Sequence, residues 1–320
     1  AYLFAGLEGV GKRLTAMIFS GVINCKNGPE DCLQNACGDC ASCRKIANGQ
    51  HPDVMVIEPE DGSTTVKIDQ IRDVQQAAAK QPHEARYRMV VIDEAHTMSE
   101  EAENALLKTL EEPASRMRMF VVTDRPHQLL ETTISRCQKL QFSALDLADV
   151  RTFLREKFPE TGESDGSDAE EDESYDDVTI DVAARYGGGS LGRSIHMLES
   201  GLLDSRKWLV EKVAETGTDE IATTLDLAEE LGRGNDQLAD QLDVLKLFFR
   251  DVMVASVPGR EGGLNNPDLD EVVHHYAGTL GADGAADRID AIQRAQDELE
   301  RNVNGQIILE SLLPDLKVQQ

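Results

Sequence analysis

The sequence has few aromatic side chains, few basic residues and no long apolar segment. Aromatic residues make up only 4% of its 320 residues, although 40% are hydrophobic. No stretch approaches the roughly 20 apolar residues that a membrane span requires, and no secretory signal is visible. These absences predict a helix-rich cytoplasmic protein with no membrane contact. The first residue is Ala1 rather than Met, and residues 2–5 already have a strand pattern, so we expect a truncated N-terminus.

Negative charge dominates the composition. The 59 Asp and Glu residues against 32 Lys and Arg residues give a formal net charge of -27. Surfaces that bind DNA without sequence preference use Lys and Arg against phosphate, so the charge argues against a broad surface of that kind but leaves open a local basic patch or DNA contact through partners. Residues 160–177 hold ten acids and no basic residue. Such a segment buries too little apolar surface to order itself, which predicts a disordered acidic insertion.

Apolar runs alternate with amphipathic segments in the first part of the chain. The expected strands are 2–5, 54–57, 89–92 and 119–122, and the expected helices are 12–22, 69–79 (with Asp69 as N-cap) and 101–110. Strands that alternate with helices predict an α/β fold whose parallel sheet is covered on both faces. Residues 144–157 and nearly everything after Val178 have helical patterns. They are interrupted at Gly187–Gly189, before a predicted helix at 191–198, and at a predicted loop, 258–267.

Residues 6–12 have the glycine spacing of a phosphate-binding loop. Gly6 and Gly11 are followed by Lys12, between a predicted strand and a predicted helix, which is the context that such loops require. The glycines, Gly9 included, let backbone N–H groups turn toward phosphate, and the lysine reaches the outer phosphates. The loop is therefore a candidate ATP site, with a glycine-rich turn that binds no nucleotide as the alternative.

The residue after the loop lysine departs from the usual pattern. A Ser or Thr hydroxyl normally binds Mg²⁺ at this position, but the sequence has Arg13, a cation without an acceptor. Thr15 lies two residues too far along to replace it. The loop is recognisable but impaired, so we expect negligible ATP hydrolysis by this chain.

Two acids follow the third predicted strand. In an ATPase, Asp93 would hold Mg²⁺ and Glu94 would polarise the attacking water. An apolar run ending in two acids is a weak signal alone, but it becomes strong after a phosphate-binding loop at this spacing. The alternative is an inherited architecture whose acids no longer do chemistry.

Five of the six cysteines lie within nineteen residues. Cys37, Cys40 and Cys43 are spaced three residues apart, and Cys25 upstream is the expected fourth ligand, with Cys32 as its rival. In a chain without an export signal this clustering favours metal over disulfides. Four thiolates suit tetrahedral Zn²⁺ and leave no open position for catalysis, so we predict a structural zinc module over residues 25–43. Free thiols are the alternative.

Several segments resemble the clamp-loader family of AAA+ proteins, the subunits that accompany bacterial DNA polymerase III. The block Asn104–Pro113 and the triplet Ser135-Arg136-Cys137 are highly specific, and the inserted Cys cluster agrees with them. His51-Pro52-Asp53 is more similar to the delta-prime type than to the gamma/tau type. A weaker match to a final collar helix covers residues 302–304 and 309–313.

The resemblance implies a fold and a set of partners. It implies an AAA+ nucleotide-binding domain with the zinc module (1–143), a helical lid (144–204) and an all-α collar (205–320). Five subunits, including gamma/tau and delta, would form an arc that loads a sliding clamp onto primer-template DNA.

The resemblance also implies roles for single residues. Arg136 would be an arginine finger that enters a neighbouring subunit's ATP site. Thr123 resembles the sensor of the γ-phosphate, with Asp124 as the competing position, and Arg193 resembles the sensor arginine of the lid. Without such a resemblance, a lone surface arginine is most simply a salt-bridge partner.

Two functions follow from these observations. The first is a structural stator subunit that completes a neighbour's active site, which Arg13 favours. The second is an active gamma/tau-type ATPase, which the intact pair Asp93 and Glu94 favours. An unrelated zinc-bearing nucleotide-binding module does not explain residues 104–113.

Overall fold

The computed structural model forms two compact units, which we describe separately. The first consists of Ala1–Leu145 with Ser190–Gly192, and the second of Asp146–Gly189 with Arg193–Gln320. The structure describes residues 1–27, 36–60, 62–159, 175–215, 221–232, 235–257, 259, 263–301 and 303–316.

The first unit is built on a parallel five-stranded sheet. Its strands are β1 (Tyr2–Gly6), β2 (Val54–Ile57), β3 (Arg88–Ile92), β4 (Met117–Thr123) and β5 (Gln138–Phe142). Their order in the sheet is β2-β3-β4-β1-β5, so β1 lies between β4 and β5 although it comes first in the chain. This order brings the loop after β1 next to residues that are distant in sequence.

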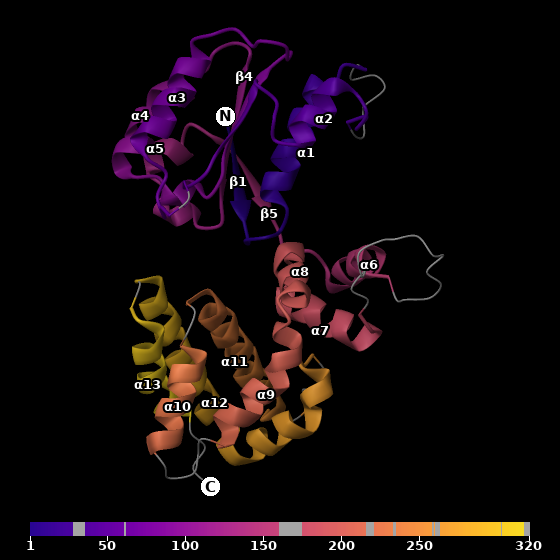
Figure 1. Ribbon diagram of the computed structural model, residues 1–320, viewed down its shortest axis with the longest axis vertical. Helices are drawn as coiled ribbons and strands as arrows, with labels where there is room; N and C mark the ends of the chain where they lie inside the picture. The colour runs from indigo at the N-terminus through magenta and orange to yellow at the C-terminus, as the bar shows by residue number, and fades with distance from the viewer. Residues whose placement is uncertain are drawn as a thin grey trace. The chain divides into compact units, whose positions relative to one another are not determined.

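Helices cover both faces of the sheet, as the alternating pattern predicts. They are α1 (Lys12–Asn24), α2 (Ala41–Ala47), α3 (Ile68–Ala78), α4 (Glu100–Glu111) and α5 (Glu131–Ile134), with short 3₁₀ turns η1 (Ala95–Thr97) and η2 (Pro126–Gln128). In Figure 1, α3, α4 and α5 lie on one side of the sheet and α1 and α2 on the other. The side chains of β3 are buried along its whole length, because both faces of a parallel sheet are covered.

Two local predictions for this unit need correction. Helix α3 has Lys67 at its N-cap, where its backbone N–H donates to the side chain of Gln70 (2.9 Å). Asp69, the predicted N-cap, lies in the first turn instead. Strand β5 was not predicted from the sequence at all. Four of its five residues are exposed, so it lacks the apolar run that identifies the other four strands.

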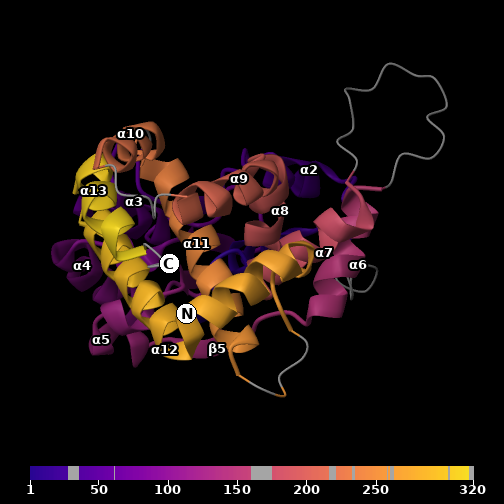
Figure 2. The same ribbon diagram turned by 90° about the horizontal axis from the view of Figure 1, so that it is seen from below.

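The second unit is all helical over the part that the structure describes. Its helices are α6 (Leu147–Lys157), α7 (Asp177–Gly187), α8 (Leu191–Glu199), α9 (Leu202–Glu215), α10 (Ile221–Leu231), α11 (Asn235–Ala255), α12 (Asp270–Glu300) and α13 (Gly305–Leu316), with a 3₁₀ turn η3 (Pro267–Leu269). Helices α11, α12 and α13 pack side by side in Figure 2 around one apolar core. Within α12, Gly281 (φ 65°) breaks the helical geometry.

The end of the predicted acidic insertion is ordered. Asp176 caps α7 by accepting a hydrogen bond from the N–H of Thr179 (2.8 Å), and Asp177 is the first residue of the helix, paired with Arg155 (2.8 Å). The prediction of disorder up to residue 177 is therefore wrong for these last residues, because helix capping and an ion pair hold them. Residues 160–174 lie outside the described part of the chain. In that part, no helix is long and apolar enough to cross a membrane.

Candidate functional site

The phosphate-binding loop leads from the end of β1 into α1, as predicted. Gly6 passes so close to β5 that an added Cβ would lie 2.3 Å from the carbonyl oxygen of Phe142, so only glycine fits there. Gly11 is the N-cap of α1 with φ 95°, a left-handed conformation that other residues rarely adopt. The loop's glycines are thus required by backbone geometry.

The loop lysine is held by its own loop. Lys12 is 7% exposed, and its ammonium group donates to the carbonyl oxygens of Gly6 (2.8 Å) and Leu7 (2.6 Å). Burial lowers the pKa of Lys12, against the opposing effect of nearby carboxylates, of which Asp124 acts most strongly. A bound phosphate would have to replace the two carbonyl oxygens as the partner of this cation.

The guanidinium of Arg13 lies between two carboxylates at the edge of the sheet. Its Nη1 contacts Glu58 (2.5 Å) and Asp93 (3.2 Å). The register of the sheet explains why the two carboxylates lie close together. Ile57 pairs with Ile92, and the two acids directly follow these residues at the ends of β2 and β3. Sequence reasoning identified Asp93 but missed Glu58, because strand adjacency is not visible in residue spacing.

These residues do not fit the Mg²⁺ that the family resemblance implies. The cation's usual hydroxyl ligand is absent, and Asp93 already binds a guanidinium. Thr15 does not replace the hydroxyl, because its Oγ1 donates to the carbonyl oxygen of Gly11 (2.9 Å) within its own helix. Glu94 has φ 45°, an uncommon conformation for a residue other than glycine, and it begins the turn η1.

The predicted sensor region lies at the end of β4. Thr123 is 1% exposed. Its Oγ1 accepts a hydrogen bond from the N–H of Arg125 (3.0 Å) and lies 3.3 Å from Nδ1 of His96. The same nitrogen lies 3.2 Å from Asp124. His96, which sequence reasoning missed, therefore connects both candidate sensor positions to the turn that follows the two acids.

Arg136 lies near the amino ends of the parallel strands, whereas the phosphate-binding loop lies at their carboxyl ends. It comes two residues before Gln138, which pairs with Tyr2 at the beginning of β1, whereas the loop follows Gly6 at the end of that strand. At a rise of about 3.3 Å per residue, the four residues from Tyr2 to Gly6 separate the two ends of β1 by about 13 Å. Arg136 therefore does not serve the loop of its own chain.

The side chain of Arg136 is partly exposed and held in place. Its Nε donates to Glu111 (2.7 Å) and its Nη1 to the carbonyl oxygen of Thr132 (2.8 Å), and one third of the side chain remains exposed. Glu111 belongs to the block 104–113, so the two most specific family segments meet here.

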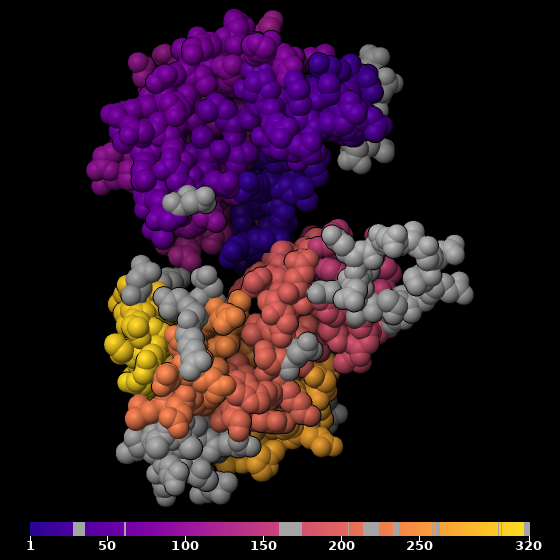
Figure 3. Space-filling model, in the orientation of Figure 1, coloured from indigo at the N-terminus to yellow at the C-terminus, as the bar shows by residue number. Residues whose placement is uncertain are grey.

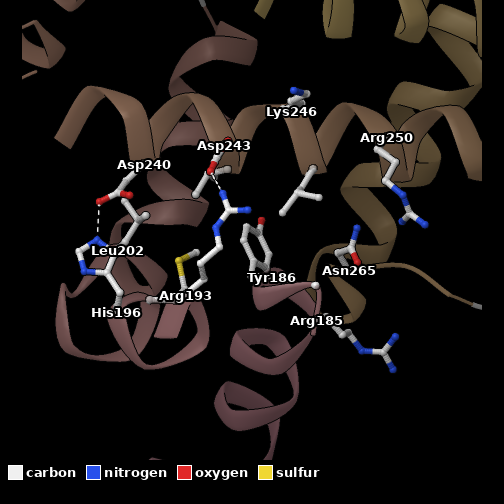
Figure 4. A pocket seen from close by; sticks show the side chains of 14 residues that line it. Arg185, Tyr186, Arg193, His196, Leu202, Asp240, Asp243, Lys246, Arg250 and Asn265 are labelled. Atoms are coloured by element: carbon white, nitrogen blue, oxygen red, sulfur yellow. Dashed lines mark hydrogen bonds and ion pairs between the residues drawn. The ribbon is translucent and has the colours of Figure 1, made fainter. Parts of the chain in front are cut away.

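The predicted sensor arginine of the lid belongs to the second unit. Arg193 on α8 forms an ion pair with Asp243 on α11, and Figure 4 shows it in the middle of a pocket of 430 Å³. His196, one helical turn further along α8, pairs with Asp240 (2.8 Å). These pairs join α8 to α11 within this unit.

The four cysteines predicted as ligands lie together. The sulfur atoms of Cys25, Cys37, Cys40 and Cys43 are all within 4.8 Å of one another, and those of Cys37 and Cys43 are 3.9 Å apart. A tetrahedral site with metal–sulfur distances of about 2.3 Å requires about 3.8 Å between sulfurs. The group could therefore hold a metal ion. Cys32 lies outside the described residues.

Local hydrogen bonds shape the cysteine cluster. The N–H of Cys40 donates to the sulfur of Cys37, and the N–H of Cys43 to the sulfur of Cys40, each at 3.4 Å. Burial raises the pKa of Cys43 to about 12. For Cys40 burial also acts upward, but hydrogen bonds from the backbone of Lys26 and Cys43 outweigh it and lower the pKa. A metal would bind the thiolates and release protons.

The side of α1 next to the loop is open to solvent. Leu14 is 63% exposed and Ile18 44%, one helical turn apart on the same face. Leu7, in the loop itself, is 49% exposed. In Figure 3 the dark indigo atoms of the first residues reach the surface of the first unit. Neighbouring apolar side chains on a surface are typical of sites that contact other molecules.

The sheet order, the loop after β1 and the acids after β3 define the fold of a P-loop protein of the α/β class. Residues 1–146 match the family model for "DNA polymerase III, delta subunit". Over 97% of its length the chain is 27% identical to DNA polymerase III subunit tau of Bacillus subtilis, of which it covers 55%. It is likewise 27% identical to the delta-prime subunit of that organism, with 98% of this chain and 89% of the relative aligned. The chain is thus similar, over nearly its whole length, to subunits of bacterial DNA polymerase III of both the tau and the delta-prime types.

The chain thus spans about half the length of the tau relative that it matches. Among solved structures, a gamma subunit-related protein of DNA polymerase III from Thermotoga maritima aligns with 99% of this chain and 93% of its own, at 17% identity and a TM-score of 0.47.

Proposed function

We propose that this chain is a delta-prime-type stator subunit of a DNA polymerase III clamp loader and supplies Arg136 in trans to a neighbouring subunit's ATP site. Its partners would be gamma/tau and delta subunits in a cytoplasmic hetero-pentamer, and the complex would load the sliding clamp onto primer-template DNA. Within the chain, residues 1–143 would be the nucleotide-binding domain, 144–204 the lid and 205–320 the collar.

The position of Arg136 carries this proposal. It lies at the end of the strands away from the chain's own phosphate-binding loop, and its side chain is one-third exposed there, so it is available to another molecule rather than to its own loop. Arginine suits phosphate because it remains charged and its planar fork meets two oxygens at once. Alignment over 89% of a delta-prime relative supports this assignment. The exposed apolar residues of α1 support a subunit interface.

An active gamma/tau-type ATPase is the second candidate. The pair Asp93 and Glu94 is intact, and several relatives are tau subunits. The contact between Arg13 and Asp93 (3.2 Å) favours the stator role, because it places a fixed cation on the carboxylate that an ATPase needs for its metal.

ATP turnover separates the two candidates. We expect negligible hydrolysis by the isolated chain, because no hydroxyl holds Mg²⁺ beside Lys12. A complex assembled with cognate gamma/tau and delta subunits should hydrolyse ATP and load clamps only when this chain is included. The measurement is steady-state phosphate release with clamp and primed DNA present. Robust multiple turnover by the chain alone would contradict the stator role.

We further propose that the cysteine cluster holds one structural Zn²⁺. Its donor set and spacing suit tetrahedral zinc, and the loop that it closes has few apolar residues. Elemental analysis of freshly purified, reduced protein should give about one zinc per chain, and Cys25→Ser should lose it while Cys137→Ser keeps it. The ligand set is wrong if Cys32→Ser loses the metal and Cys25→Ser does not.

A further inference from the structure

The chain's phosphate-binding loop carries two adjacent cations that already have partners within the protein. Lys12 donates to the carbonyl oxygens of Gly6 and Leu7. Arg13 bridges the carboxylates of Glu58 and Asp93. The charges that act on Lys12 include those of Asp93 and Asp124. The loop thus lies near carboxylates whose negative charge favours cations there even when no ligand is bound.

The bridge occupies the place where a metal would be expected. Arg13 is in the first turn of α1, directly after the loop lysine, and Asp93 directly follows β3, so the pair spans the two elements that normally hold Mg²⁺ between them. One nitrogen of Arg13 contacts both carboxylates, so the contacting oxygens of Glu58 and Asp93 are at most 5.7 Å apart, the sum of the two distances.

We propose that Arg13, held by Glu58 and Asp93, is a built-in substitute for magnesium that keeps divalent cations out of this chain's phosphate-binding loop. Mg²⁺ requires about six oxygen ligands at about 2.1 Å in near-octahedral geometry. The guanidinium offers no oxygen, repels a second cation and already uses one oxygen of each acid. The first unit therefore keeps its loop neutralised without metal or nucleotide.

Glu58 has a defined part in this arrangement. An arginine beside Asp93 alone would leave Glu58 as a second carboxylate at the same strand edge, free to attract a cation. Arg13, Glu58 and Asp93 together carry a net charge of one negative unit. Without Arg13, the two acids carry two negative units. Arg13 and Glu58 are about half exposed, whereas Asp93 is 17% exposed, and pairs with exposed members contribute little to stability. The loss of Arg13 should therefore leave the fold intact and expose the two acids.

The inference rests on the proposed assignment of residues 6–13 as a phosphate-binding loop but not on the proposed role of Arg136. The test uses the full chain and inorganic tripolyphosphate, which engages the loop and the metal without a base. Thermal unfolding is followed with tripolyphosphate in metal-depleted buffer and again with added Mg²⁺. No chelator is added, because it would also compete for any metal held by the cysteine cluster.

The wild-type midpoint should move by less than about 1 °C on adding Mg²⁺. In Arg13→Thr, which restores a hydroxyl, the midpoint should rise by about 3 °C or more, since a ligand that binds only the folded state stabilises it. Arg13→Thr combined with Asp93→Asn should lose this rise. Arg72→Thr is the matched control, because it removes another exposed arginine–aspartate pair (2.7 Å) in the same unit and should behave as wild type.

Two results would overturn the proposal. If the wild-type midpoint rises with Mg²⁺ as much as that of Arg13→Thr, the metal binds beside the arginine. If Arg13→Thr gains no more than wild type, Arg13 is not what excludes the metal. Neither result bears on clamp loading, so failure here is distinguishable from failure of the stator role.

Discussion

Replacing Arg136 with alanine should slow ATP hydrolysis at the neighbouring subunit's site by about a thousandfold, the lower range for arginine fingers in phosphoryl transfer. The guanidinium would face the charge that develops on the γ-phosphate, and the methyl group of alanine offers nothing in its place. Clamp loading should fall with it. The experiment compares complexes that differ only in this chain, by single-turnover hydrolysis and clamp loading on primed DNA.

Folding and assembly should hardly change in the same variant. The pair that Arg136 forms with Glu111 is partly exposed, and such pairs contribute about 0–1 kcal/mol. Arg136→Lys should recover part of the rate, because it keeps the charge and loses the fork. Arg72→Ala, which removes another surface pair, is the control and should leave the rate unchanged. Equal rates for the Arg136→Ala and wild-type complexes would make Arg136 an ordinary surface arginine.

Replacing Asp53 with alanine should destabilise the first unit by about 3–5 kcal/mol, the usual loss when one partner of a buried ion pair is removed. Asp53 is fully buried, and it pairs with Arg88 (3.0 Å). Its carboxylate also accepts hydrogen bonds from the backbone N–H groups of residues 83–85, at 2.8–3.0 Å. Alanine would leave these backbone donors without their acceptor, and Arg88 would keep carbonyl acceptors but lose its charge partner.

Calorimetry can follow this loss. In a unit of this size the loss should lower the unfolding midpoint by about 10–15 °C. Asp69→Ala is the control, because Asp69 also pairs with an arginine but its side chain is 81% exposed, so its loss should cost less than about 1 kcal/mol. A midpoint for Asp53→Ala within about 2 °C of the control would show that the buried pair does not hold this region.

The same carboxylate should make the first unit sensitive to acid. Burial acts to raise the pKa of Asp53, but the hydrogen bonds from Glu84, His83 and Ala85 and from Arg88 outweigh it and lower the pKa to about 2. Because the folded pKa lies below the unfolded value of 3.8, the group contributes about 2 kcal/mol above that value. This contribution is lost as the pH falls from about 4 through 2.

Local patterns in the sequence determined much of this protein. The first four strands, the phosphate-binding loop and the helix that follows it are visible because apolar periodicity and glycine spacing act over a few residues. The cysteine cluster is equally local, since three of its members lie within seven residues. The block 104–113 and the triplet at 135–137 identified the family for a similar reason, because each is a continuous segment.

The tertiary structure alone decided which distant residues meet. Glu58 faces Arg13 because β2 and β3 are neighbours in the sheet, and the order β2-β3-β4-β1-β5 is not the order of the chain. Strand β5 was missed because four of its five residues are exposed, which removes the apolar pattern. The carboxylate of Asp251 offers a further example, since it is fully buried and accepts hydrogen bonds from Asn266 at 2.7 and 2.8 Å.

The separation of Arg136 from the loop of its own chain is likewise visible only in the register of β1 and β5, which places the two at opposite ends of the strands. Sequence spacing reports contacts within one strand or helix, where geometry repeats every two or 3.6 residues. Contacts between elements depend on which strands pair and on which face each helix packs. Those are set by burial over the whole unit, so they become visible only once the chain is folded.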